Sequence, residues 1–130
     1  MPSSLLLVED SDDDVFLMQR AFAKAQLTHP LTIARDGTEA MALLADENRP
    51  LPALILLDLN LPVQSGLDVL RWIREQPRLQ GLPVYVYSAS IRAQDAERAK
   101  AAGATEYLVK PAGTDELVRM AGRLRTLLDG

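Results

Sequence analysis

Polar side chains that could do chemistry follow short apolar runs of this sequence. Glu9 and Asp10 follow an apolar run at residues 5–8, and Asp58 follows another at residues 53–57. Carboxylates that gather repel one another, so a cluster of them is typical of a site for a hard divalent cation. Mg²⁺ takes oxygen ligands and keeps several waters, and Asp10 and Asp58 could supply its carboxylates. The sequence therefore predicts a magnesium site.

Two further polar side chains stand at the ends of later apolar runs. Ser88 follows residues 84–87, and Lys110 follows residues 107–109 and precedes Pro111. Serine offers a rotatable hydroxyl donor, and lysine is a strongly hydrated point charge that suits phosphate. A cation beside an oxygen nucleophile, with a lysine and a hydroxyl that can bind equatorial oxygens, is the equipment for phosphoryl transfer. We therefore expect phosphoryl chemistry with a carboxylate as the acceptor.

These side chains can meet only if the apolar runs are strands of one parallel sheet. Residues 53–57 are apolar without alternation, which is typical of a parallel strand covered on both faces. Strands that alternate with helices favour a parallel sheet with right-handed crossovers. We predict an α/β fold, a three-layer sandwich of five strand–helix units, with its site at the carboxyl ends of the strands. The expected strands are 5–8, 31–34, 53–57, 84–87 and 107–109, and the expected helices are 12–25, 37 to before Pro50, 67 to near Pro77, 94–102 and 114–128.

Length and composition bound the remaining possibilities. The chain has 130 residues, a formal net charge of −4 and no cysteine, which excludes disulfide scaffolds, cysteine zinc sites and thiol catalysis. It lacks a basic stripe typical of nucleic-acid binding, and no apolar run approaches the roughly 20 residues that cross a bilayer. We expect one domain over residues 1–130, with a core from about residue 5 to 128. We expect it to be cytoplasmic, with no output domain and no contact with nucleic acid or membrane.

Several conspicuous residues have ordinary structural interpretations. Asp12, Asp13 and Asp14 are expected to cap a helix, and His29, the only histidine, is expected to be exposed to solvent. The residues expected in the core for their helical spacing are Trp72, Phe16, Phe22 and the methionines. The glycines expected at turns or caps that permit positive φ are Gly37, Gly66 and Gly103.

From residue 5 to 128, the chain resembles the receiver domains of response regulators in two-component signalling. The resemblance rests on four motifs in combination, which are Val8-Glu9-Asp10, the segment Leu57-Asp58-Leu59-Asn60-Leu61-Pro62 with Gly66, the pair Ser88-Ala89 and the pair Lys110-Pro111. It implies a flavodoxin-like (βα)5 fold with strand order 2-1-3-4-5. It also implies a single-domain response regulator that accepts a phosphoryl group from a histidine kinase on Asp58 and then switches a protein-interaction surface.

The resemblance implies a metal role for four residues. Asp10 and Asp58, with the backbone carbonyl of Asn60, would bind Mg²⁺, and Glu9 would hold the ion through water. The domain would not be an enzyme that acts on a separate substrate, although it would catalyse its own phosphotransfer and dephosphorylation.

The resemblance also implies roles around the phosphoryl group. Lys110 would pair with the Asp58 carboxylate and then with a phosphate oxygen, and Ser88 would hydrogen-bond another phosphate oxygen. Ser88 and Tyr107 would form the switch, because movement of Ser88 toward the phosphate vacates volume that the Tyr107 ring could enter. The side chains of Asn60 and Ser90 would face the phosphoryl group and set the lifetime of the phosphorylated state.

Within the family, the chain is most similar to stand-alone receivers that partner phytochrome-type sensor kinases. The expected partners are a sensor histidine kinase or a phosphotransfer protein, and an unidentified downstream protein. The protein would be a monomer, or a homodimer through the surface of its fourth helix, fifth strand and fifth helix.

Two other functions remain as alternatives. A pseudo-receiver would keep the fold as a phosphorylation-independent interaction module. A phosphohydrolase of the haloacid dehalogenase type would use a nucleophilic Asp followed two positions later by a general acid. That position is Asn60 here, and an amide cannot donate and retake a proton as a carboxyl group does.

Overall fold

Strands and helices alternate along the chain, as the sequence predicts. The computed structural model describes residues 4–62 and 64–129. Its strands are β1 (Leu5–Val8), β2 (Leu31–Ala34), β3 (Leu54–Leu57), β4 (Val84–Ser88) and β5 (Glu106–Val109). Its helices are α1 (Asp12–Lys24), α2 (Gly37–Ala45), α3 (Gly66–Glu75), α4 (Ala93–Ala101) and α5 (Thr114–Asp129), and a short 3₁₀ helix (Pro77–Leu79) follows α3. Ser88 is therefore the last residue of β4 and does not follow it.

The five strands form one parallel sheet in the order β2-β1-β3-β4-β5, which confirms the expected topology. Leu5 of β1 pairs with Leu31 of β2 on one side and with Leu54 of β3 on the other. The strand order reverses at β1, so the carboxyl ends of β1 and β3 lie next to each other at the point where parallel α/β folds place their sites.

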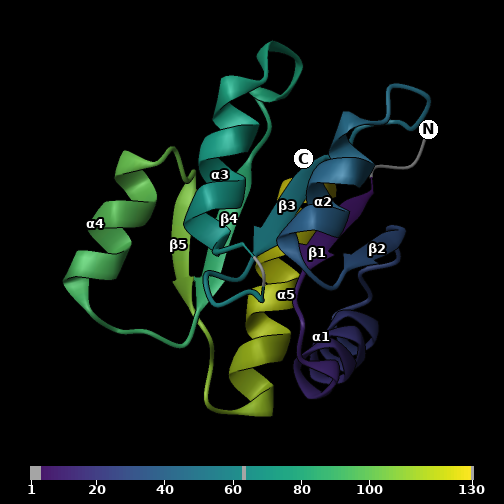
Figure 1. Cartoon of the computed structure of the whole chain (residues 1–130). Helices are drawn as coiled ribbons and strands as arrows, with labels where there is room; N and C mark the ends of the chain where they lie inside the picture. Colours follow the sequence, from purple (N-terminus) through teal and green to yellow (C-terminus); the bar gives the residue numbers. More distant parts are fainter. Residues whose placement is uncertain (1–3, 63, 130) are drawn as a thin grey trace.

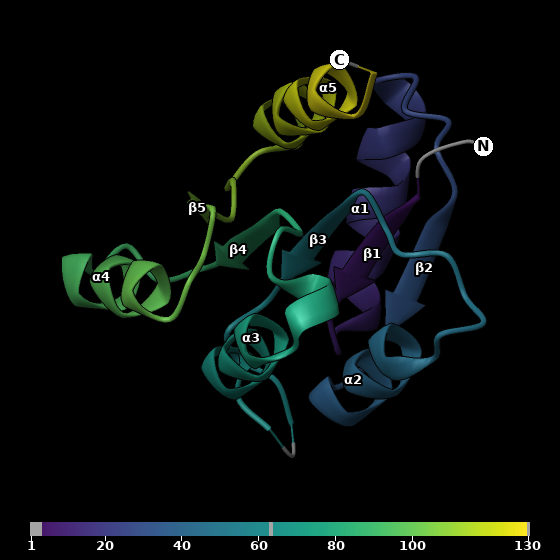
Figure 2. The ribbon, with the colours of Figure 1, turned by 90° about the horizontal axis from the view of Figure 1, so that it is seen from above.

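Helices cover both faces of this sheet (Figure 1). Seen from above, α1 and α5 lie on one side of the strands, while α2 and α3 lie on the other (Figure 2). Successive side chains of β1 serve the two faces in turn: Leu5 and Leu7 pack with α1 and α5, whereas Leu6 and Val8 pack with α2 and α3. The three-layer sandwich is thus confirmed, and none of the helices in the described ranges is long and apolar enough to span a membrane.

The residue that caps α1 is Ser11, which corrects the expectation that Asp12, Asp13 and Asp14 do so. The Ser11 hydroxyl accepts the backbone N–H of Asp14 at 3.3 Å. The three aspartates occupy the first turn of α1, where their charges favour the helix dipole. Their side chains are therefore available for other contacts.

Two further expectations are wrong. The Phe16 side chain is 57% exposed, with the Arg20 guanidinium 5.7 Å from its ring centre, because the buried stripe of α1 passes through Val15, Met18 and Phe22 instead. His29 is not open to solvent: its side chain is only 17% exposed, and its Nε2 atom lies 2.7 Å from a carboxylate oxygen of Asp129 at the end of α5. Trp72, Phe22, Met18, Met41 and Met120 do pack in or against the core, and Met1 lies outside the described residues.

Candidate functional site

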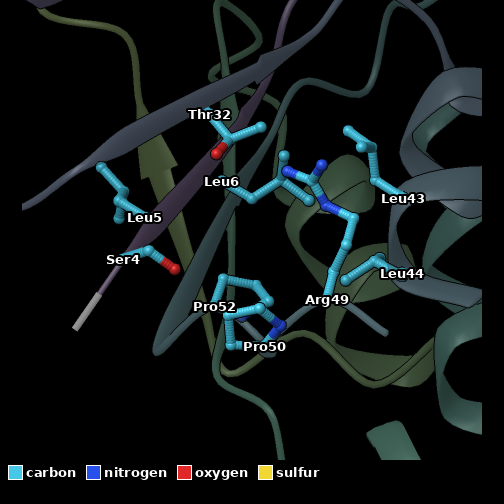
Figure 3. Close-up of a pocket in the computed structure, with 9 residues that line it drawn as sticks. All are labelled: Ser4, Leu5, Leu6, Thr32, Leu43, Leu44, Arg49, Pro50 and Pro52. Atoms are coloured by element: carbon cyan, nitrogen blue, oxygen red, sulfur yellow. The ribbon is translucent and has the colours of Figure 1, made fainter. Parts of the chain in front are cut away.

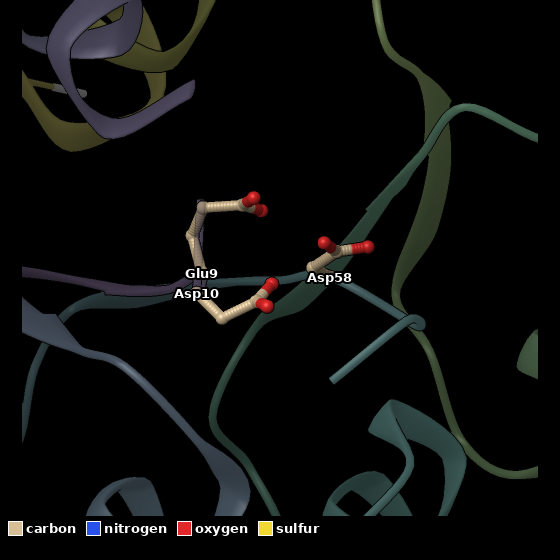
Figure 4. A group of neighbouring side chains, drawn as sticks. All are labelled: Glu9, Asp10 and Asp58. Carbon is tan, nitrogen blue, oxygen red and sulfur yellow. The ribbon is translucent and has the colours of Figure 1, made fainter. Parts of the chain in front are cut away.

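Three carboxylates meet where β1 and β3 end. Glu9 and Asp10 follow β1, Asp58 follows β3, and one oxygen of each lies within 4.8 Å of the others. Figure 4 shows the side chains of Glu9 and Asp10 extending from the end of β1 beside Asp58. Glu9 and Asp58 are only 1% and 4% exposed, whereas Asp10 is open to solvent. The cluster therefore has two buried members and one at the surface.

Lys110, the first residue after β5, reaches into this cluster. Its Nζ atom lies 3.3 Å from Glu9 Oε2 and 3.3 Å from Asp58 Oδ2. It lies closer still, at 2.9 Å, to Asp14 Oδ2 in the first turn of α1. Sequence reasoning missed Asp14, although its position in the helix that follows β1 places it at the same edge of the sheet. The ammonium group also lies 5.1 Å from the centre of the Tyr87 ring.

Burial and crowding disturb the acid–base properties of these groups. Burial, together with a hydrogen bond and charge repulsion from Asp58, raises the pKa of Glu9 to about 8. Burial alone would lower the pKa of Lys110, but the hydrogen bond to Asp14 and the charges of Asp58 and Glu9 outweigh it, so the net pKa is raised. Lys110 is thus held as a cation, while Glu9 is only weakly disposed to ionise beside Asp58.

The turn after β3 is held tightly around Asp58. Asp58 Oδ1 accepts the backbone N–H of Asn60 at 3.1 Å, and the Leu59 carbonyl accepts the N–H of Gly66 at 2.9 Å. A Cβ atom on Gly66 would lie 2.2 Å from the Asp58 carbonyl oxygen and 2.6 Å from Leu59 Cα. Gly66 is therefore a glycine because the start of α3 touches this turn, and the expected positive φ is found at Gly103 but not at Gly66 or Gly37.

Ser88 and Tyr107 are joined through the segment between β4 and α4. Ser88 is fully buried, and its Oγ atom accepts the N–H of Ser90 at 3.2 Å. The Tyr107 hydroxyl donates to the Ser90 carbonyl at 2.8 Å, and its ring packs against the core on the α2 and α3 side. The Ser90 hydroxyl itself bonds to Asp95 in α4, a contact that the sequence did not predict. One pocket beside Asp58 is lined in part by Asn60, Ser88, Ser90 and Asp95.

The donor set fits a hard divalent cation. It consists of oxygens alone, and the carboxylates of Glu9, Asp10 and Asp58 are close enough together to share one ion. Lys110 alone leaves this cluster with an excess of negative charge. A cation bound there would supply charge neutralisation for an incoming phosphoryl group.

Most of the chain matches the model of one protein family. A family model described as "Response regulator receiver domain" matches residues 5–122. The chain belongs to the response regulator receiver family. This membership confirms the resemblance that the sequence motifs indicate. Receiver domains are signalling domains that act in phosphorylation-based two-component signalling.

Individual relatives agree with this membership. The chain is 40% identical over 123 residues to response regulator Rcp1 of Synechocystis sp., a match that covers 92% of this chain and 84% of Rcp1. A structure of Rcp1 described as Mn²⁺-bound has a TM-score of 0.85 and 38% identity, and covers 96% of this chain and 93% of its own. The structure of the phosphorylated cyanobacterial phytochrome response regulator RcpA has a TM-score of 0.91 and 35% identity. That match covers 100% of this chain and 96% of the RcpA chain. The predicted similarity to phytochrome response regulators is thus confirmed.

Another pocket of this receiver domain lies at the opposite edge of the sheet from the carboxylate cluster. This pocket has a volume of about 140 Å³. Figure 3 shows the residues that line it, which come from the beginnings of β1 and β2, the end of α2 and the segment before β3. Its polar groups are Ser4, Thr32 and Arg49. Because Leu5 and Leu54 begin their strands, this pocket belongs to the amino-terminal edge of the sheet, opposite the carboxylate cluster.

Proposed function

We propose that this receiver domain accepts a phosphoryl group on Asp58 from a phosphohistidine of a sensor kinase or a phosphotransfer protein. The observation that carries the proposal is the environment of Asp58. Its buried carboxylate has one oxygen on the N–H of Asn60 and the other 3.3 Å from Lys110, beside two further carboxylates. A carboxylate oxygen forms the new bond to phosphorus, and the bond from phosphorus to the histidine nitrogen breaks, with its electron pair left on nitrogen.

Each neighbouring group has a proposed task. Asp10, Asp58 and the Asn60 carbonyl would hold Mg²⁺, with Glu9 acting through a water. Lys110 would pass from the Asp58 carboxylate to a phosphoryl oxygen, since its raised pKa keeps it charged. Ser88 would donate a hydrogen bond to another phosphoryl oxygen. The Tyr107 ring would then move into the volume that Ser88 leaves, which would change the surface of α4, β5 and α5. We propose that the same groups later position a water for hydrolysis of the phosphorylated carboxylate.

The proposed kinase is phytochrome-like, because RcpA and the bacteriophytochrome response regulator AtBRR are among the similar structures. The proposed output surface is that of α4, β5 and α5. A groove along β5 and α5 belongs to it, and its lining includes Val109, Met120, Glu116, Arg119 and Arg123. Val109 is 43% exposed there, and such a mixture of apolar and charged side chains suits a downstream protein or a second copy. A cytoplasmic location and a single domain over residues 1–130 stay predictions.

Intact mass measurement after incubation with acetyl phosphate tests the proposal. Wild-type protein should gain one phosphoryl group with Mg²⁺ and none with a chelator. Asp58→Asn, which keeps the shape of the side chain, should gain none. Asp115→Asn, a matched change of an exposed aspartate on α5, should behave as wild type.

Labelling that persists in Asp58→Asn would overturn the assignment of the acceptor. Absence of labelling in wild-type protein that is folded and binds Mg²⁺ would instead favour a phosphorylation-independent interaction module. Sustained turnover of a phosphomonoester would revive the phosphohydrolase alternative.

A further inference from the structure

Four hydrogen bonds at Ser90 join the site to the start of α4. Its N–H donates to Ser88 Oγ at 3.2 Å, and its carbonyl oxygen accepts the Tyr107 hydroxyl at 2.8 Å. Its own hydroxyl donates to a carboxylate oxygen of Asp95 and accepts the N–H of Arg92 at 3.2 Å. Ser90 is therefore held by α4 and in turn holds two side chains of the site.

We infer that Asp95 is a positioning residue for phosphoryl transfer, which acts through Ser90 on Ser88 and Tyr107 and so couples α4 to Asp58. This inference rests on the proposed function of Asp58. None of the motifs that point to Asp58 includes Asp95. It lines the same pocket as Ser88, and its bond to the Ser90 hydroxyl connects it to the side chains of the site.

The setting of Asp95 suits it to a fixed position. It lies in the first turn of α4, where a carboxylate is favoured by the helix dipole, and its side chain is only 20% exposed. Arg92 Nε stands 3.7 Å from it. A charged acceptor makes a stronger bond to the Ser90 hydroxyl than a neutral one would.

The direction of the effect follows from the donors and acceptors. Because Ser88 Oγ accepts the Ser90 N–H, the hydroxyl proton of Ser88 remains to be donated to a phosphoryl oxygen. The Tyr107 hydroxyl donates its hydrogen bond to the Ser90 carbonyl, and this bond holds the Tyr107 ring in its half-buried position. Without Asp95, Ser90 can move, and Ser88 and Tyr107 must be ordered when the phosphoryl group arrives. Loss of Asp95 should therefore weaken phosphoryl binding.

The first test uses beryllofluoride with Mg²⁺, a mimic of a phosphoryl group on a carboxylate. Asp95→Ala and Ser90→Ala should each weaken its binding by about threefold to tenfold, the factor expected for one net hydrogen bond. Asp95→Asn keeps an oxygen acceptor for the Ser90 hydroxyl and should restore most of the affinity. Glu97→Ala changes an exposed acidic residue of the same helix and should leave the affinity unchanged.

A double-mutant cycle separates positioning from simple stabilisation of α4. If Asp95 acts through Ser90, Asp95→Ala should have a smaller effect on beryllofluoride affinity in a Tyr107→Phe background than alone. A residue that only stabilises the helix would give additive effects. Additive effects, or unchanged affinity in folded Asp95→Ala, would overturn the inference.

Amide hydrogen exchange of the metal-free protein tests the contact without the chemistry of Asp58. Asp95→Ala should speed the exchange of the Ser90 and Arg92 amides, whose N–H groups are bonded in this segment, and leave β1 protected. Unchanged exchange at both amides would refute the inference even if the wild type is labelled normally. A wild type that is never labelled would refute the proposed function instead, and the exchange result would still report on Asp95.

Discussion

The ammonium group of Lys110 lies closer to Asp14, at 2.9 Å, than to Asp58, at 3.3 Å. Asp14 comes from the first turn of α1, whereas Asp58 and Glu9 follow strands. One lysine charge is thus shared among three carboxylates from three segments of the chain. Lys110 therefore stabilises the folded site in addition to any role toward a phosphoryl group.

Lys110→Ala should leave Glu9 and Asp58 buried together without their cation. The free energy of unfolding of the metal-free protein should fall by roughly 3 kcal/mol, the cost typical of breaking a buried ion pair. Mg²⁺ should restore part of it, because the ion replaces the missing charge. Urea unfolding measures this, with Lys100→Ala on the exposed side of α4 as the control. Equal stability of Lys110→Ala and wild type in a chelator would contradict the prediction.

The stability of the metal-free protein should fall as the pH rises above the acidic range. Glu9 has a pKa of about 8 in the folded protein, against an ordinary value of 4.5. Between these values the folded state binds the proton more tightly than the unfolded state, so the free energy of unfolding decreases with rising pH. Urea unfolding between about pH 5 and pH 8.5 should show this decrease. Glu9→Gln should flatten it, and an unchanged pH dependence in that variant would assign the effect to other groups.

Gly66→Ala should destabilise the protein, because a Cβ atom would lie 2.2 Å from the Asp58 carbonyl oxygen. Backbone must move to admit it, which we expect to cost about 3 kcal/mol of unfolding free energy. Gly122→Ala is the matched control, since a Cβ atom added at this position in α5 would meet no heavy atom within 4 Å beyond its own helix backbone and chain neighbours. That change should stabilise the protein by about 0.5–1 kcal/mol through helix propensity. Thermal unfolding of the two variants in parallel tests this prediction. Similar shifts of the unfolding temperature in both variants would refute the close approach at Gly66.

Arg74 joins α3 to two later segments of the chain. Its guanidinium donates to the carbonyls of Gly103 at 2.9 Å, Gln80 at 2.9 Å and Leu82 at 2.8 Å. Arg74→Ala leaves these acceptors without a donor and should lower the free energy of unfolding by about 2–4 kcal/mol. Arg71→Ala, in the same helix but 59% exposed, should change it by less than about 0.5 kcal/mol. A small effect of Arg74→Ala in chemical denaturation would show that water replaces these bonds.

Much of the fold and of the carboxylate cluster could be predicted because both depend on short-range patterns. Apolar runs separated by helical periodicity require a parallel sheet covered on both faces, and a parallel sheet brings its carboxyl ends to one edge. Their closeness to one another follows from the topology alone, because each of these residues stands at such an end: Glu9, Asp10, Asp58, Ser88 and Lys110.

Other contacts depended on the tertiary structure. Whether Phe16 or Val15 faces the core is set by the rotation of α1 against α5, and a helix with apolar residues on several sides does not fix that rotation locally. His29 and Asp129 are a hundred positions apart, and their contact exists only because α5 ends beside the loop that leads into β2.

Local apolar patterning along the chain specifies which edge of the sheet carries the chemistry, because it encodes the direction and the ends of the strands. The contact of Asp14 with Lys110 and that of Asp95 with Ser90 follow instead from how the helices pack. Both contacts depend on the angle and distance at which a helix packs on the sheet. Those quantities come from the sum of many buried side chains, so no single motif records them.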